Sequence, residues 1–201
     1  MEIGLNLAKK VNEYFNDAQL VLNETAKLAG KIEFAAQLMI NCLSSGGTVY
    51  WCGNGGSAAD SQHLAAELIG RFKIDRPPLR SIALTTDTSI LTATGNDFGF
   101  EHIFSRQIQA LGKIEDLVVG ISTSGRSANV INVLKEAKKI GMSSVAMTGS
   151  AHSEMWELSN LSLAVPSTET SHIQEMHILI GQLICGLAEE HFFGKVQNAQ
   201  S

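Results

Sequence analysis

The sequence predicts a doubly wound α/β fold, in which a parallel five-stranded sheet is covered by helices on both faces. Short, continuously apolar segments alternate with amphipathic segments of helical spacing along the 201 residues. This alternation is typical of parallel sheets that are buried on both sides. In addition, turns rich in glycine or hydroxyl groups follow two of the apolar segments and lead directly into helices, as expected for βα units.

The chain begins with two predicted helices and continues as alternating strands and helices. Apolar residues recur at helical spacing over 5–28 and 32–43, with Lys, Glu and Asn between them, so two leading helices are predicted. The predicted strands are 48–52, 81–84, 117–121, 144–147 and 161–165. The later predicted helices lie near 58–71, 88–94, 99–111, 127–140, 152–159 and 170–190.

The amino-acid composition is that of a single acidic domain. With 44% hydrophobic residues, the chain can bury one substantial core, so we expect a single domain over 1–196 and a short tail at 197–201. The net charge of −5 argues against binding along a nucleic-acid backbone. No apolar run reaches the ~18 residues of a membrane span. Three cysteines without paired spacing suit a reducing compartment, and we expect a cytoplasmic protein.

The most informative turn follows the first predicted strand. Residues 53–57 read Gly-Asn-Gly-Gly-Ser and lead into a helix that carries His63 and Glu67. The glycines let the backbone approach a ligand without a Cβ clash, and the start of the helix presents unpaired N–H groups that attract an anion such as phosphate. His63 and Glu67 are four residues apart and therefore share a helix face. Together these features favour a sugar-phosphate enzyme.

Two other interpretations of this segment stay open on the sequence alone. The turn can be a tight connection and the His/Glu pair a solvated surface pair. Gly53, Gly55 and Ala58 also match the G-x-G-x-x-A pattern of dinucleotide-binding turns. That pattern needs an acidic residue about 20 positions further on, at the end of the second strand. The second predicted strand ends near Asp87, well beyond that distance.

Two more segments lie where a ligand can bind, beyond predicted strands. Residues 122–127 read Ser-Thr-Ser-Gly-Arg-Ser and precede a helix, and their hydroxyl groups together with the helix N–H groups can hold a phosphate. Ser127 can instead cap the helix through its side-chain oxygen, which is compatible with phosphate binding. Residues 95–99 read Gly-Asn-Asp-Phe-Gly before the helix predicted at 99–111. By composition they are equally compatible with a simple polar turn.

Four separated segments carry a resemblance to a known family. Residues 52–57, 95–100, 120–125 and 173–177 read Cys-Gly-Asn-Gly-Gly-Ser, Gly-Asn-Asp-Phe-Gly-Phe, Gly-Ile-Ser-Thr-Ser-Gly and Ile-Gln-Glu-Met-His. In their order and spacing they resemble the phosphoheptose isomerases of the sugar-isomerase (SIS) fold. The resemblance covers nearly the whole chain. It implies conversion of sedoheptulose 7-phosphate to D-glycero-D-manno-heptose 7-phosphate for lipopolysaccharide or capsule heptose. It also implies a homotetramer with sites at subunit contacts, in which the helices of 1–45 pack.

The resemblance also implies roles for individual residues. His63, Glu67 and Gln174 match three of the family's four zinc ligands, and Glu67 matches its catalytic carboxylate. A carboxylate is needed because a base must carry a proton between C1 and C2 through a cis-enediol. The implied substrate-binding residues, with the phosphate loop at 122–127, are Asn54, Gly55, Gly56, Ser57, Glu67, Asn96, Asp97, Ser122, Thr123, Ser124, Ser127 and Gln174.

One position departs from the family pattern. The fourth zinc ligand of the family is a His that also exchanges protons, eight residues after the Gln, and here that position is Gln182. An amide does not exchange a proton near neutral pH, although its carbonyl oxygen can coordinate a metal weakly. We therefore expect zinc to be held, but weakly. His172 stands where the family usually has Arg. His177 points about 60° to the other side of the helix, so we expect a packed or solvated histidine there.

The departure at Gln182 leaves a second function open. The chain also resembles a tetrameric bacterial scaffold that binds the replication initiator DnaA. That scaffold shares residues 53–54, 58–59, 62–63 and 173–177 and lacks the second histidine as well. That scaffold has no carboxylate at the position of Glu67, so its presence here favours the enzyme. A sugar-phosphate-sensing regulator of the same fold usually accompanies a DNA-binding domain, for which this sequence has no segment.

Overall fold

The structure, a computed structural model, describes residues 6–197 and confirms the predicted fold class. All five strands are parallel and lie in the order β2-β1-β3-β4-β5. Their bounds are β1 Val49–Gly53, β2 Ser81–Ala83, β3 Leu117–Ile121, β4 Ser143–Thr148 and β5 Leu161–Ala164. Each agrees with its predicted strand to within one residue at either end. Of the predicted tail, residues 198–201 lie outside the described part of the chain.

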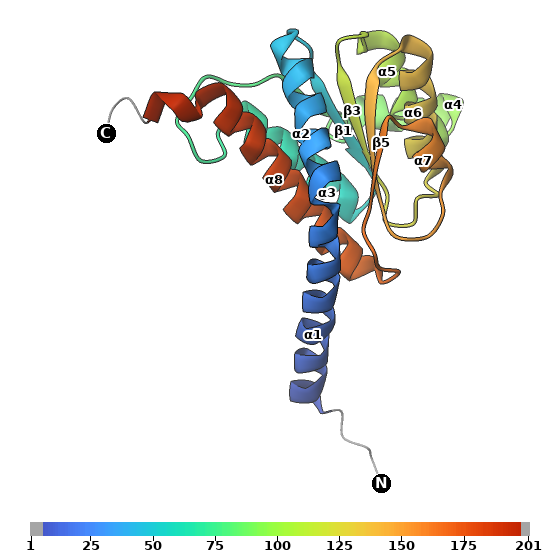
Figure 1. The fold of residues 1–201 in the computed structure, drawn as a ribbon. Coiled ribbons are helices and arrows are strands. Elements are labelled where there is room, and N and C mark those ends of the chain that lie inside the picture. The colour runs from blue at the N-terminus through green and yellow to red at the C-terminus, as the bar shows by residue number, and fades with distance from the viewer. Residues whose placement is uncertain (1–5, 198–201) are drawn as a thin grey trace.

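Helices cover both faces of the sheet (Figure 1). One face carries α2 (Ala29–Ser44), α3 (Gly56–Ile69) and α8 (Thr170–Gln197). The other carries α4 (Thr88–Phe98), α5 (Ser105–Leu111), α6 (Ala128–Ile140) and α7 (Glu154–Leu158). The strand residues alternate between these two layers. In β1, for example, Val49 and Trp51 pack toward the first layer, whereas Tyr50 and Cys52 pack toward the second.

The amino-terminal helix stands apart from the rest of the fold. Helix α1 (Leu7–Thr25) continues through a 3₁₀ turn (Ala26–Leu28) into α2, and Figure 1 shows it projecting well beyond the sheet. The two predicted leading helices are thus nearly continuous. Thr25 is the only buried residue that α1 contains. Most of its large apolar side chains are exposed, namely Leu7, Val11, Tyr14, Phe15, Leu20 and Leu22.

Two predictions near residue 99 are wrong. Residues 95–98 form the last turn of α4 rather than a separate polar turn. Asp87 starts this helix, because its Oδ1 accepts the N–H of Ile90 at 2.9 Å, and Gly99 ends it with φ +95°, a backbone conformation that favours glycine. The predicted helix 99–111 is therefore broken into a 3₁₀ turn (Phe100–His102) and α5. Because the Asp87 carboxylate serves as a helix cap, it gives no support to the dinucleotide interpretation.

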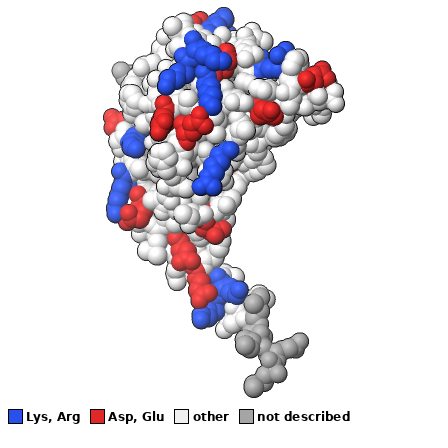
Figure 2. Space-filling model, turned by 90° about the vertical axis from the view of Figure 1, so that its right-hand side faces the viewer, with Lys and Arg blue, Asp and Glu red and all other residues white. Residues whose placement is uncertain are grey.

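The face that Figure 2 presents shows no continuous basic patch. There, Lys and Arg are interspersed with Asp and Glu, which fits the net charge of −5 rather than a basic patch. Within residues 6–197, no helix is long and apolar enough to cross a bilayer.

Candidate active site

The glycine-rich turn at residues 53–57, called the glycine turn below, lets α8 pack against the beginning of α3. Gly55 has φ +55°, a conformation that costs other residues energy, and it turns the chain from β1 into α3. A Cβ at Gly56 would collide with the side-chain amide of Gln174. The Gln174 side chain of α8 thus rests directly on the first turn of α3, as close as a glycine permits.

One face of α3 carries three polar side chains. Nε2 of His63 and Oε1 of Glu67 are 2.8 Å apart, and the Glu67 side chain is 19% exposed, so the pair is partly shielded from water. Asp60 lies one turn earlier on this face. Its Oδ2 is buried and has no hydrogen-bond partner among the described residues. Burial raises the pKa of the Asp60 carboxyl above its usual range, although His63 and Gln174 act in the opposite direction.

Asp60 was missed in the sequence analysis. The signal was present, because Asp60 precedes His63 by three residues and this spacing puts both on one helix face. Only the structure shows that the carboxyl is turned inward, toward Gln174 of α8.

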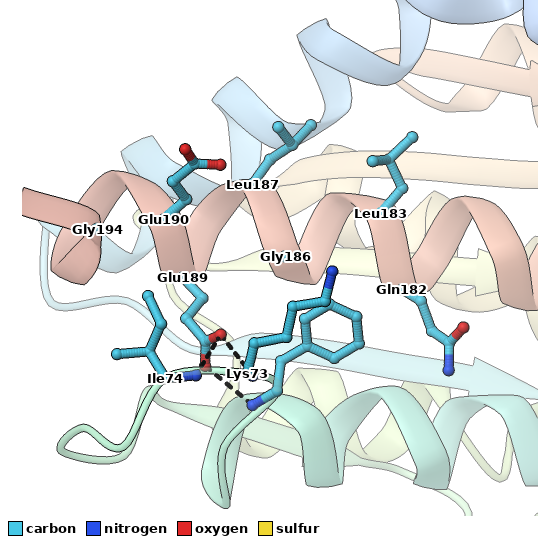
Figure 3. Close-up of a pocket in the computed structure, with 10 residues that line it drawn as sticks. Lys73, Ile74, Gln182, Leu183, Gly186, Leu187, Glu189, Glu190 and Gly194 are labelled. Carbon is cyan, nitrogen blue, oxygen red and sulfur yellow. Dashed lines mark hydrogen bonds between the residues drawn. The ribbon is translucent and has the colours of Figure 1, made fainter. Parts of the chain in front are cut away.

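Gln182, the residue that differs from the family pattern, lies beside the pair of His63 and Glu67. Its Nε2 is 3.3 Å from Nε2 of His63, and Figure 3 shows the side chain reaching away from α8 on the side of α3. A flip of this amide turns either its oxygen or its nitrogen toward His63. Either way, an amide occupies the position next to the imidazole.

This donor set fits a zinc ion in kind, although it offers few strong ligands. His63 and Glu67 supply an imidazole nitrogen and a carboxylate oxygen, both ordinary zinc donors, and they already converge. Gln174 and Gln182 add amide oxygens only, which bind zinc more weakly. Across residues 6–197 no group of three His, Cys, Asp or Glu side chains is arranged around a common point. A zinc ion at this place would therefore need the amide oxygens among its ligands.

The turn at residues 122–127, called the hydroxyl turn below, brings three serine side chains together in front of α6. Oγ of Ser122 lies 2.9 Å from Oγ of Ser127 and 3.5 Å from Oγ of Ser124. Gly125, with φ +65°, closes the turn. Ser127 is the residue at the amino-terminal cap of α6, but its side chain does not make the capping hydrogen bond. The alternative that it only caps the helix is therefore wrong, and its hydroxyl faces Ser122 instead.

Two asparagines join the glycine turn to the hydroxyl turn. Nδ2 of Asn54 donates to Oδ1 of Asn129, and Nδ2 of Asn129 donates back to Oδ1 of Asn54, both at 2.8 Å. Asn129 is the second residue of α6, so the pair fixes the starts of α3 and α6 relative to each other. The predicted binding residue Asn54 thus holds the turn in shape.

The other predicted substrate-binding residues make fewer contacts with the rest of the site. Asn96 and Asp97 lie on the exposed last turn of α4, where Nδ2 of Asn96 donates to Oδ1 of Asp97 at 2.8 Å. A hollow of about 170 Å³ separates the glycine turn from this region and is lined by Asn54, Gly55, Leu91 and Phe100, among others. A second hollow of about 220 Å³ contains Thr123 and Ser124. The described chain places these parts around one edge of the sheet without enclosing them.

Two histidines of α8, His172 and His177, have structural surroundings. His177 is fully buried, and its Nε2 donates to the carbonyl of Thr148 at 3.1 Å, which confirms a packed histidine. Burial lowers the pKa of the His177 imidazole to about 4, against the effect of this hydrogen bond. The ring of His172 packs against Tyr14 of α1 in a tilted arrangement, with 4.5 Å between ring centroids, and its Nδ1 lies 3.0 Å from Oε2 of Glu175.

Comparison with known proteins identifies the family. The SIS domain model matches residues 13–149. The phosphoheptose isomerase of Akkermansia muciniphila is 51% identical over 169 residues, which cover 84% of this chain and 89% of that protein. The phosphoheptose isomerase of Campylobacter jejuni serotype O:6 is 48% identical over 182 residues, covering 90% and 98%. The chain belongs to the phosphoheptose isomerases of the SIS family.

Solved structures of family members agree with this assignment. Phosphoheptose isomerase GmhA from Neisseria gonorrhoeae superimposes with a TM-score of 0.87 at 43% identity, covering 92% of this chain and all of that one. A phosphoheptose isomerase from Francisella tularensis gives a TM-score of 0.89 at 37% identity with the same coverage. The family resemblance inferred from four short segments therefore extends over the whole fold.

Proposed function

We propose that the chain converts sedoheptulose 7-phosphate to D-glycero-D-manno-heptose 7-phosphate, for lipopolysaccharide or capsule heptose, with Glu67 as the base. The observation that carries this proposal is the pairing of His63 and Glu67 at 2.8 Å beside the glycine turn, in a chain whose relatives at about 50% identity are phosphoheptose isomerases. His63 keeps the carboxylate oriented, and the helix gives it a rigid support.

The proposed reaction needs one base on one face of the sugar. The Glu67 carboxylate removes the proton from C1 of the ketose, the C1–H electrons form the C1=C2 bond of a cis-enediol, and O2 takes a proton from water. Glu67 then returns its proton to C2, the O1–H electrons form the C1=O bond of the aldose, and the O1 proton goes back to water, so no proton is gained or lost overall. Gln182 can hydrogen-bond a sugar oxygen but does not exchange its proton. Hydroxyls of Ser122, Thr123, Ser124 and Ser127, with N–H groups of the turn, hold the phosphate.

Zinc is the proposed cofactor. His63, Glu67 and Gln174 would hold it, with the amide of Gln182 in place of the family's fourth ligand. When bound, zinc polarises the sugar carbonyl and so favours removal of the C1 proton. The support is the convergence of His63 and Glu67 and the buried, unpaired carboxyl oxygen of Asp60 beside Gln174.

The proposed assembly is a homotetramer in the cytoplasm. Helix α1 presents a row of exposed apolar side chains that includes Leu7, Val11 and Phe15, and such a face calls for a partner. A second copy of the chain is the occupant that the family resemblance implies. The cytoplasmic location is supported by three buried cysteines that form no disulfide. The relatives reported above are isomerases by name, so we do not propose the DnaA-binding scaffold.

A direct assay tests the proposed reaction. Purified protein is incubated with sedoheptulose 7-phosphate, with and without added zinc, and the aldose product is detected by chromatography. We expect product with the phosphorylated sugar and little or none with sedoheptulose itself, because the hydroxyl turn binds the phosphate. If folded protein supplied with zinc forms no aldose, the proposed function is wrong, and a pull-down against DnaA then tests the scaffold.

A further inference from the structure

A buried ion pair outside the predicted site joins the segment after α3 to α8. Nε of Arg76 lies 2.9 Å from Oε1 of Glu189, and the two side chains are 1% and 2% exposed. Burying two charges is costly unless they are paired and fully hydrogen-bonded. Such a pair is therefore expected to make many further hydrogen bonds. The groups that accept or donate these bonds show which parts of the chain the pair holds together.

Both carboxylate oxygens of Glu189 accept hydrogen bonds from backbone N–H groups of the segment that follows α3. Its Oε1 accepts the N–H of Phe72 at 2.9 Å, and its Oε2 accepts the N–H groups of Lys73 and Ile74 at 2.7 and 3.0 Å. Figure 3 shows this segment wrapped around the carboxylate. Burial would raise the pKa of the Glu189 carboxyl, but these hydrogen bonds and Arg76 outweigh it and lower the pKa. The carboxylate thus anchors residues 72–74 to α8.

Arg76 caps the end of α3. Its Nη2 donates to the carbonyl of Glu67 and its Nη1 to the carbonyl of Leu68, both at 2.8 Å. The last carbonyls of a helix have no partner within the helix, and here a guanidinium held by Glu189 supplies the partners. The residue whose carbonyl it binds, Glu67, is the one whose side chain is the proposed base.

The packing between α3 and α8 leaves little freedom around this connection. A Cβ at Gly186 of α8 would lie 2.9 Å from Cε1 of Phe72, and one at Gly181 would collide with Leu64 of α3. The segment after α3 and the helix itself therefore approach α8 as closely as glycine allows. Gln182, which faces His63, lies between these two contacts on α8.

We propose that Arg76 and Glu189 are positioning residues for Glu67. The pair fixes the last turn of α3 against α8, and so sets the distance between the Glu67 carboxylate on one helix and Gln174 and Gln182 on the other. This inference rests on the proposed function, in which Glu67 is the base. Neither residue contacts the substrate, since both side chains are buried.

The positioning role predicts an effect on turnover rather than on substrate affinity. A misplacement of about 1 Å in a reacting group can lower a rate by on the order of 100-fold. The phosphate is held by residues 122–127, which lie on the β3–α6 connection and do not touch this ion pair. Disturbing the end of α3 should therefore lower kcat and leave KM nearly unchanged.

The test compares Arg76→Lys and Glu189→Gln with a matched control. Asp116→Asn alters another buried carboxylate that accepts backbone N–H groups, from Thr48 at 2.7 Å and Lys113 at 2.8 Å, at the opposite end of the strands. Lysine keeps the charge at position 76 but carries it on a single nitrogen, so it does not reproduce the separate Nε, Nη1 and Nη2 donors that reach Glu189 and the two carbonyls. We expect kcat per folded protein to fall at least tenfold in both variants, with KM within twofold, while Asp116→Asn keeps the wild-type kcat despite a lower melting temperature.

Hydrogen exchange supplies a readout that does not depend on activity. Amides of residues 66–74 should exchange faster in Arg76→Lys and Glu189→Gln, and not in the control. Unchanged kcat and unchanged exchange in these variants, or an equal loss of kcat in Asp116→Asn, would overturn the positioning role. An inactive wild-type enzyme would instead contradict the proposed function, and the exchange pattern alone would then show whether the pair fixes the end of α3.

Discussion

The two halves of the candidate site differ in how their polar groups are held. On α3 and α8, the carboxylate, imidazole and amide side chains lie on helix faces, and His63 contacts both Glu67 on its own helix and Gln182 on α8. On the β3–α6 connection, three serine hydroxyls contact mainly each other and stand before a helix start. The helical half suits chemistry that needs a fixed atom, whereas the turn suits capture of an anion whose oxygens replace the contacts between hydroxyls. The comparison predicts that changes in the helical half affect kcat and changes in the turn affect KM.

The largest effect is expected for Glu67→Gln. The amide keeps the shape of the side chain but cannot accept a proton, so kcat should fall by about 10²- to 10⁴-fold, the usual contribution of general base catalysis. KM should change little. Glu157→Gln, at an exposed position on α7, is the control with the same change of charge. A variant at Glu67 that keeps more than a tenth of wild-type turnover would remove this residue from the role of base.

The complementary change is the double substitution Ser122→Ala and Ser124→Ala. A hydrogen bond to a charged group contributes about 1.5–3 kcal/mol, so KM for the sugar phosphate should rise at least 100-fold with a smaller change in kcat. Ser159→Ala with Ser162→Ala alters another pair of hydroxyls in mutual contact, 3.3 Å apart, and should leave KM unchanged. A normal KM in the folded variant at positions 122 and 124 would place the phosphate elsewhere.

The pH dependence of stability tests whether His177, on the core-facing side of α8, titrates as a buried group. Its pKa is about 4 in the folded chain and about 6.5 when unfolded. Between these values the unfolded chain binds a proton that the folded chain does not, so stability falls as pH falls through this window. The loss should approach about 3 kcal/mol at pH 4. His177→Gln should lack this component in urea unfolding at pH 7 and pH 4. Equal losses of stability in both proteins would show that His177 titrates normally.

The smallest effect is expected for Gln182→His. Imidazole is a better zinc donor than an amide oxygen, and position 182 already faces His63, so zinc should bind about tenfold more tightly, and turnover should rise because a titrating group is restored. Gln109→His, on the exposed side of α5, controls for an added surface histidine. If neither zinc affinity nor turnover increases in a folded Gln182→His variant, the zinc site proposed for this chain is wrong.

The sequence predicts elements whose pattern is local and misses features that depend on distant partners. The five strands follow from short apolar segments, and the His63–Glu67 pair follows from helical spacing. Residues 95–98 were misjudged because glycine, asparagine and aspartate favour turns, yet the Asp87 cap and the contacts of α4 keep them helical. Arg76 and Glu189 could not be paired in advance, because they are 113 residues apart and each looks like an ordinary surface charge in the sequence.

The reciprocal pair of Asn54 and Asn129 bears on the entropy of substrate binding. Glycine turns lose much conformational freedom when they become ordered, and a ligand that has to order such a turn binds more weakly by that amount. The two hydrogen bonds between the amides hold the turn in its final shape during folding, before any ligand is present. The affinity for the sugar phosphate is therefore not reduced by the cost of ordering Gly55 and Gly56.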